Sequence, residues 1–566
     1  MSPRLSSLSL LFLLGGLSLT ACSGSDKDTG GSFGDDGGGD DGGDDGGDDG
    51  GDDGGADGGG EDGGADGGGE DGGADGGGED GGTDGGGDGG EVAADGDGYN
   101  APADCDDSDP DVHPGADEVC NNHADDCDEE VDEDAIDATY VTADNDGDGF
   151  GDPDGAELSC DGSGVDNTLD CDDDNPDEPQ VVDEAGTGTP DGSAAHPWRT
   201  VQDGIDAARA CVVVYAGTYS EAIDFGGKDI AVVGVDGPAD TTLDASGTGA
   251  PVVTFDGGES EGALLSGFTI TGGEGYASTT TTSRDCGSGS TCYDSVTTYC
   301  GGGIYMNGAS PSLDNLVVQA NELPESGSTE SGSTTYYTSS FGGGLCLTNA
   351  SPKLHLVRVN ENYAVMGGGV YADEDSVLEA HQIEVIANTA SDGAGIAVDG
   401  GSATVANALV IWNVAGMDGG GLLQAGGDLA LFNATLGEND ATGGGGISGT
   451  TEGRLLVMNS IVYGSDTGYG IQISGSATLG ISYSDVYGNA AGEYSDGADM
   501  TGVDGNISSD PKFSAVDSDS NYYDDDWSLG AGSPCEDAGN PEAAFDDPDG
   551  TANDMGAYGG PDGTWP

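Results

Sequence analysis

The sequence predicts an all-β fold in which parallel strands follow a coiled chain path, because two independent markers repeat with one period. The first marker is three small residues followed by an aliphatic residue, and its last five copies are spaced 25, 26, 26 and 25 residues apart. Its aliphatic residues are Ile304, Leu345, Val370, Ile396, Leu422 and Ile447. The second marker is an asparagine 17 or 18 residues after each of the first five copies, namely Asn321, Asn362, Asn388, Asn413 and Asn439. Short strands with Gly and Asn turns at this period favour a β-solenoid over a propeller or a helical repeat.

A third observation is the alternation of side chains before each asparagine. The positions three and five residues earlier are apolar throughout: Val318 and Leu316, Val359 and Val357, Val385 and Ile383, Val410 and Ala408, Leu436 and Ala434. The positions four residues earlier are mixed: Val317, Arg358, Glu384, Leu409 and Thr435. This period of two predicts an inward apolar stripe and an outward face. We expect the asparagines to stack one per coil at about 4.8 Å, to share amide hydrogen bonds and to adopt the left-handed bend at that corner.

The N-terminus, residues 1–22, has a basic start, the apolar run LSLLFLLGGLSL and the ending Leu19-Thr20-Ala21-Cys22. It resembles a bacterial lipoprotein signal peptide. The resemblance implies that Cys22 becomes a lipid-modified N-terminus, which anchors the chain to a membrane without spanning it. Ser23 after the cysteine implies the outer membrane. We therefore expect a lipid-anchored, surface-exposed protein.

Residues 23–97 consist almost entirely of Gly, Asp, Glu and Ala, which predicts a disordered, extended linker because few apolar side chains are available to offset the entropy of ordering. The whole chain has 110 Asp and Glu against 10 Lys and Arg, a formal net charge of −100. Such a charge excludes nucleic acid as a partner and favours cations.

Residues 98–182 contain cysteines, prolines and an internal repeat, since DCDDSDP at 104–110 returns as DCDDDNP at 170–176. The stretches DCDDSDPDVHPGADEVCN and DCDEEVDE resemble the metal-binding motif module of the MopE-like secreted proteins. The resemblance implies metal ligation by Asp104, Asp106, Asp109, Asp126, Asp128 and Asp132.

The stretch DNDGDGFGD, residues 144–152, is typical of a calcium loop, because calcium takes six to eight oxygen ligands and alternate side chains can surround one ion. Positions 1, 3, 5, 7 and 9 of such a loop are Asp144, Asp146, Asp148, the Phe150 carbonyl and Asp152. Gly149 occupies position 6, where the loop turns sharply. Position 12 is Gly155, so Glu157 or an acid of DCDDDNP would have to supply the closing ligand. Repulsion among these carboxylates predicts that the module folds only when loaded with metal.

Twelve cysteines indicate an oxidising compartment, and five of them, Cys105, Cys120, Cys127, Cys160 and Cys171, lie in this small module. Once Cys22 carries lipid, an odd number is left, so at least one thiol stays free or pairs between chains. We expect Cys211, in the apolar run CVVVYAG, to be a buried free thiol. Cys286, Cys292 and Cys300 are placed to cross-link a Ser/Thr-rich insert, with the pairing open.

Residues 190–566 resemble the right-handed parallel β-helix family, the pectate-lyase-like solenoids. PWRTVQDGIDAA is similar to the N-terminal cap of that family, with a short helix over 200–210, and DPKF to DMGAYGG is similar to its C-terminal end. Two inserts, 277–300 and 323–341, interrupt the coils, and long loops on one side of a solenoid often build a binding face.

Two functions fit this fold, because fold alone does not give function. We favour binding or adhesion to extracellular ligands such as glycans or surface proteins, in which aromatic side chains stack on sugar rings: Tyr336, Tyr337, Tyr363, Tyr371 and Trp412. The alternative is a polysaccharide lyase or hydrolase, for which the candidate catalytic residues are Lys353, His355, Arg358, His381 and Glu384. The resemblance to MopE-like proteins also suggests copper binding, although no His/Met cluster accompanies it.

Overall fold

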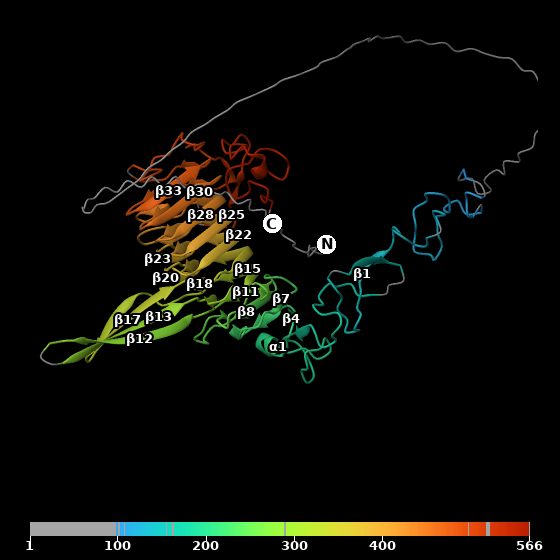
Figure 1. Ribbon diagram of the computed structural model, residues 1–566, viewed down its shortest axis with the longest axis horizontal. Coiled ribbons are helices and arrows are strands. Elements are labelled where there is room, and N and C mark those ends of the chain that lie inside the picture. Colours follow the sequence, from blue (N-terminus) through green and yellow to red (C-terminus); the bar gives the residue numbers. More distant parts are fainter. Residues whose placement is uncertain are drawn as a thin grey trace, which may run out of the picture. The chain divides into compact units, whose positions relative to one another are not determined.

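The computed structural model describes residues 98–564 except 100–101, 107, 129, 154, 161–163, 288–289, 496 and 517–520. The predicted signal peptide, Cys22 and the linker lie outside the described residues, so these predictions stay untested. The residues that are described belong to one compact unit, Asp88–Pro566, and β-strands dominate it (Figure 1). Its helices, within that part of the chain, include none long and apolar enough to cross a membrane.

Stacked parallel strands form three sheets, which identifies the coiled part as a right-handed parallel β-helix. Sheet I contains β3 (Gln180–Val182), β4 (Cys211–Val214), β5 (Gly217–Tyr219), β7 (Ala231–Gly234), β8 (Thr241–Asp244), β10 (Leu264–Ser266), β11 (Thr269–Thr271), β15 (Ser312–Gln319), β19 (Lys353–Asn360), β22 (Val377–Ile386), β25 (Ser402–Ile411), β28 (Asp428–Gly437), β30 (Gly453–Met458), β31 (Ile461–Tyr463), β33 (Ala477–Ser482) and β34 (Asp485–Tyr487). Sheet II contains β6 (Ile223–Asp224), β9 (Val253–Phe255), β14 (Ile304–Asn307), β18 (Leu345–Thr348), β21 (Val370–Ala372), β24 (Ile396–Val398), β27 (Leu422–Gln424), β29 (Gly444–Gly449) and β32 (Tyr469–Ile473). Sheet III contains β12 (Tyr276–Asp285), β13 (Thr291–Cys300), β16 (Gly327–Ser331), β17 (Thr334–Phe341), β20 (Tyr363–Met366), β23 (Thr389–Asp392) and β26 (Val414–Ala415).

Each regular coil contributes one strand to sheet II, one to sheet I and one to sheet III. The coil that begins at Leu345, for example, runs through β18, β19 and β20 before β21 starts the next coil. The aliphatic residue of the first sequence marker begins or lies in the sheet II strand, and Leu345 pairs with Val370 in parallel register. The period near 25 residues is therefore one turn of the solenoid.

The predicted inward stripe is confirmed. All ten side chains at three and five positions before the asparagines are at most 1% exposed, and they join one continuous core cluster. Burial of each Val, Leu or Ile side chain stabilises the fold by about 1.5–3 kcal/mol. The pattern of period two thus decides which face of sheet I packs inside.

The outward positions show one difference from the sequence expectation. Arg358 and Glu384 form a cross-coil ion pair on the outer face, as adjacent coils predict. Leu409 and Thr435 also point outward, yet they are only 5% and 1% exposed. A later segment of the chain covers them.

The asparagine ladder is confirmed as well. The Nδ2 of each amide donates to the Oδ1 of the next one in the order Asn321, Asn362, Asn388, Asn413, Asn439, at 2.9 to 3.1 Å. The expected left-handed bend at the asparagine itself is wrong, because the residue before each asparagine adopts it. Those residues are Ala320, Glu361, Ala387, Trp412 and Glu438, with φ between 50° and 59°. Since the preceding residue turns the corner, the asparagine side chain is left free to point inward.

The first coil is closed by the predicted helix, α1 (Val201–Ala207). Thr200 caps its N-terminus by accepting the Asp203 N–H at 3.2 Å, and Glu221 accepts the Val201 N–H at 2.7 Å. Lys228 donates to the last carbonyls, including that of Ile205 at 2.6 Å. Val201 and Ile205 are buried against the core, so the helix covers the apolar end of the stack.

The C-terminal residues 521–564, called the strap from here on, pack back over the outer face of sheet I. The Nδ2 of Asn407 donates to the carbonyls of Ala557 and Gly559 at 3.0 and 2.9 Å. Trp527 is 2% exposed and lies in a cluster with Leu409 and Ile411. The strap contains β36 (Asp526–Leu529), paired antiparallel with β35 (Phe513–Ala515), and the 3-10 helix η1 (Ala543–Phe545).

Candidate metal centre

The acidic loop 144–152 joins the strands β1 (Thr139–Thr142) and β2 (Ala156–Ser159), which pair antiparallel. The structure brings Asp144, Asp146 and Asp148 together, with one carboxylate oxygen of each within 4.8 Å of the others. Gly149 has φ +100°, the left-handed conformation that position 6 of a calcium loop requires. The loop therefore has the bend and the three convergent carboxylates that its sequence predicts.

Asp170, the first residue of DCDDDNP, lies against this loop. Its backbone N–H donates to the Gly151 carbonyl at 3.2 Å, and its side chain is 2% exposed. The Asp170 Oδ2 and the Asp146 Oδ2 are both buried without a hydrogen-bond partner among the described residues. Buried polar atoms are rarely left unpaired, so two such carboxylate oxygens on neighbouring acidic residues make this region suited to hold a cation.

The pKa values of these groups reflect the crowding of buried negative charge. Burial, with repulsion from Asp146, Asp170 and Asp144, raises the pKa of Asp148 to about 6 despite the hydrogen bond from the Phe150 N–H. Burial also raises the pKa of Asp170, and the Asp146 charge adds to the shift. A divalent cation would reverse this balance by stabilising every ionised form.

The donor set fits calcium, because the three convergent side chains of the loop and the neighbouring Asp170 all offer hard carboxylate oxygens. Asp170, which packs against the loop, is a candidate for the closing ligand that position 12 lacks; there Gly155 donates its N–H to the Asp152 carbonyl at 3.0 Å. Asp152 and the Phe150 carbonyl remain predicted ligands; Phe150 is buried and donates its N–H to Asp148 at 2.8 Å. The alternative ligand Glu157 has a side chain outside the described part of the structure.

A second acidic group lies nearer the start of the module. Oxygens of Glu118, Asp126 and Glu133 converge within 4.8 Å, and so do those of Asp128, Glu130 and Glu133. Among the residues predicted there, only Asp126 and Asp128 take part. The glutamates, which stand in DEVC and DCDEEVDE, were not among the predicted ligands, because the resemblance to MopE-like proteins implied aspartates alone.

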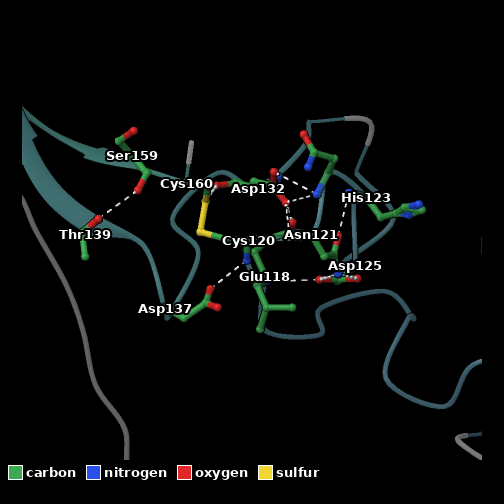
Figure 2. The surroundings of a disulfide bond; sticks show 12 residues. Glu118, Cys120, Asn121, His123, Asp125, Asp132, Asp137, Thr139, Ser159 and Cys160 are labelled. Carbon is green, nitrogen blue, oxygen red and sulfur yellow. Dashed lines mark hydrogen bonds between the residues drawn. A yellow bond between two sulfur atoms is a disulfide. The ribbon is translucent and has the colours of Figure 1, made fainter. Parts of the chain in front are cut away.

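The other predicted ligands of this region have different partners in the structure. Asp106 and Asp109 accept the N–H groups of Ser108 and Asp111, both at 3.2 Å, and so close tight turns. Asp132 accepts the N–H groups of Asn121 and Asn122 at 2.9 Å, as Figure 2 shows around the disulfide. Asp104 is 5% exposed and its Oδ2 has no partner among the described residues. Asp106, Asp109 and Asp132 therefore stabilise turns in this stretch, and metal ligation by these residues and Asp104 stays a prediction.

Three disulfides connect the module. They are Cys105–Cys127, Cys120–Cys160 and Cys171–Cys211. Around Cys120–Cys160 the Asp137 carboxylate accepts the Cys120 N–H at 2.7 Å (Figure 2). The expectation of a free thiol at Cys211 is therefore wrong: a buried cysteine in an apolar strand looks the same in sequence whether or not a partner 40 residues away reaches it. Among the described residues the buried free cysteine is Cys535.

The remaining disulfides belong to the coils. Cys286–Cys292 closes the tip of the first insert, whereas Cys300 pairs with Cys346 on the following coil. The first insert is thus cross-linked within itself and also tied to the stack.

The five candidate catalytic residues lie on β19 and β22, with His355 beside His381 and Arg358 beside Glu384 in register. Each is already paired. Lys353 Nζ lies 2.6 Å from Glu261, His355 Nδ1 lies 2.7 Å from Asp314, and His381 Nε2 lies 3.3 Å from Asp562 of the strap. The hydrogen bond to Asp314 raises the pKa of His355, and the one to His381 lowers that of Asp562.

A cavity of about 500 Å³ lies beside this group, and Lys353 is the candidate that lines it, together with Glu261 and Glu379. The other four candidates are absent from its described lining. The strap occupies the outer face next to them, because Gln382 Nε2 donates to the Asp562 carbonyl at 3.0 Å. Lys353 therefore lines this cavity without the other four candidates.

The predicted aromatic residues are also dispersed. Tyr371 is 9% exposed and donates to Asp399 at 3.1 Å, and Trp412 donates to Asp525 of the strap at 3.2 Å. Tyr363 is half-buried on β20. Tyr336 and Tyr337 are 46% and 41% exposed on β17, which makes them the accessible members of the set.

Comparison with known proteins adds little to these observations. No protein family and no curated protein matches the chain. Among solved structures the chain is similar to the crystal structure of pectate lyase Pel9A, with 16% sequence identity and a TM-score of 0.35 over 69% of this chain and 99% of that one. The fold assignment rests on the strand pairing described above and not on this similarity.

Proposed function

We propose that this chain is a lipid-anchored surface protein in which a calcium-loaded module precedes a β-helix that binds extracellular ligands. The observation that carries the calcium assignment is the pair of buried oxygens on Asp146 and Asp170 without a hydrogen-bond partner among the described residues, next to the convergent carboxylates of Asp144, Asp146 and Asp148. The all-oxygen donor set favours calcium over copper. The anchor and the surface location are supported by residues 1–22 alone.

The binding role of the β-helix is supported by its paired basic residues. Arg358 is neutralised by Glu384, and His381 is engaged by Asp562 of the strap. A base for proton abstraction has to be free to reach a substrate, and these groups contact protein partners instead.

The calcium assignment is tested with the full chain by thermal melting and metal analysis. With calcium at about 100 times Kd, binding stabilises the folded module by about 2.7 kcal/mol, and chelation removes that stability. Asp170→Asn should weaken calcium binding strongly, while the matched control Asp174→Asn, at an exposed residue of the same acidic run, should leave it unchanged. Equal melting temperatures with calcium and with chelator would contradict the proposal, and a larger shift with copper would favour the copper alternative.

A second candidate function is polysaccharide cleavage, and the cavity lined by Lys353, Glu261 and Glu379 is the observation that favours it. Its test is the release of reducing ends or unsaturated products from a panel of acidic and neutral polysaccharides. Lys353→Ala should abolish such activity, while Arg454→Ala, which removes a surface partner of Asp428, should preserve it. Substrate binding without product release would support the binding role.

A further inference from the structure

The two inserts are ordered strands that together form four strands of sheet III. β12 pairs antiparallel with β13, β13 pairs parallel with β17, and β17 pairs antiparallel with β16. Figure 1 shows β12, β13 and β17 extending beyond the stacked coils. β12 and β16 are exposed along their whole length. We call residues 276–300 and 327–341 the tongue.

Three of the charged side chains of the tongue, Arg284, Asp294 and Glu330, lie on one face. Arg284 lies 3.0 Å from Asp294 and 3.4 Å from the Thr335 hydroxyl, which places these three side chains on the same side. Glu330 pairs in register with Thr335 and shares that side, because residues directly opposite on paired strands point to one face. We call it the charged face.

The opposite face consists of hydroxyl groups and tyrosine rings. Cross-strand hydrogen bonds join Thr279 to Thr297 at 3.0 Å and Thr281 to Ser295 at 3.2 Å, which fixes the side on which these groups lie. Tyr336 pairs in register with Ser295 and therefore shares this side. Asp285, at the tip, is its acidic residue, and that carboxylate accepts the Gly287 N–H at 2.8 Å. We call this side the hydroxyl face.

Two tyrosines of the hydroxyl face are close enough to act together. Tyr293 pairs with Thr334, two positions before Tyr336 on β17, so the two rings are offset by about 7 Å along neighbouring strands that lie about 4.8 Å apart. Tyr293 is 42% exposed and Tyr336 is 46% exposed. A hydrogen-bonded sheet holds both rings in place, which reduces the entropy lost when a ligand binds.

The charge distribution decides the class of ligand. The chain carries a net charge of −100, so an anionic polymer is repelled and a cationic partner is attracted to the many acidic surfaces elsewhere. The hydroxyl face offers flat apolar rings beside hydrogen-bonding hydroxyls, and a neutral sugar chain presents the complementary C–H faces and hydroxyl groups.

We propose that the hydroxyl face of the tongue binds a neutral polysaccharide, with Tyr293 and Tyr336 as the stacking residues. This site deepens the binding role proposed for the β-helix and rests on it. The cross-strand hydroxyl pairs position the flanking threonines, so that sugar hydroxyls meet an ordered row of donors and acceptors.

The experiment measures binding of the full chain to neutral polysaccharides (cellulose, β-1,3-glucan and starch) and to the anionic polymers pectin and alginate. Tyr336→Ala and Tyr293→Ala should each weaken binding to a neutral polymer by about tenfold or more. The matched control is Tyr337→Ala, which removes an equally exposed ring from the charged face of the same strand and should change binding less than twofold. Thermal melting of all three variants checks that the tongue stays folded.

The outcomes separate the two proposals. Neutral-polymer binding that survives both Tyr293→Ala and Tyr336→Ala overturns the hydroxyl face and keeps the binding role of the β-helix. Binding to none of the polymers overturns both. Preference for pectin or alginate overturns the neutral class, and sedimentation that shows a dimer dependent on Tyr336 assigns the face to a second copy of the chain.

Discussion

The module and the coils are stabilised in opposite ways. Between residues 98 and 178 the buried apolar side chains, among those described, are Ala135, Val141 and Phe150, whereas one apolar cluster extends through the coils from Val182 to Tyr494. The module instead buries carboxylates, including Asp104, Glu118 and Asp170. A region with so little apolar burial depends on cross-links and ions, while a periodic apolar core depends on neither. We therefore expect the stability of the module to depend on oxidising conditions and on bound cations.

The largest expected effect comes from removing the cross-links of the module. Replacing Cys120 and Cys160 by serine should destabilise the module by about 2–4 kcal/mol, since the bond closes a long loop of the unfolded chain. Hydrogen exchange should show this loss in residues 98–170 and unchanged protection in β22 and β25. Chelation should enlarge the effect. Loss of protection in the coils at the same time would contradict independent stabilisation of the module and the coils.

A smaller effect is expected from interrupting the asparagine ladder. Asn388 donates to Asn413 and to the Val359 carbonyl, and it accepts the N–H and the amide of Asn362. Asn388→Ala leaves buried donors unpaired, which costs about 2 kcal/mol or more, measured as a lower melting temperature. Thr389→Ala, at the exposed neighbour, is the control. This loss should be the same with calcium and with chelator. A loss that depends on calcium would show that the stability of the coils is coupled to the metal site of the module.

The smallest effect is expected at the outer face of sheet I. Arg358→Ala removes the ion pair with Glu384, whose two side chains are 46% and 17% exposed, and pairs at a protein surface contribute about 1 kcal/mol or less. The melting temperature should fall slightly, and by less in high salt, where screening already weakens the pair. A loss as large as that of Asn388→Ala would show that Arg358 has a further role.

Sequence periodicity predicted the coils well, because every coil repeats the same local physics. The inward stripe and the ladder follow from side-chain alternation and from one buried amide per turn. Contacts without a period escaped prediction. Leu409 and Thr435 look like outward residues, and only the folded strap, more than 100 residues later, accounts for their burial.

The candidate site was predicted in part for a similar reason. Asp144, Asp146 and Asp148 follow a local pattern, so their convergence could be predicted. Asp170 is 22 residues beyond Asp148 and meets the loop through backbone pairing near Gly151, which no local motif encodes. The sequence predicted that Glu157 or an acid of DCDDDNP supplies the closing ligand. The burial of Asp170 favours this first residue of DCDDDNP.

The strap has a consequence for how the solenoid comes apart. In an ordinary solenoid each coil touches only its neighbours, so end coils can peel away one after another. Here one segment contacts Gln382 on β22, Asn407 on β25, Asn433 on β28 and Asn459 after β30. Any of these four coils can detach only after the strap has released all of them. The C-terminal half therefore opens as one cooperative block, and its resistance to pulling or proteolysis is set by a segment that belongs to no coil.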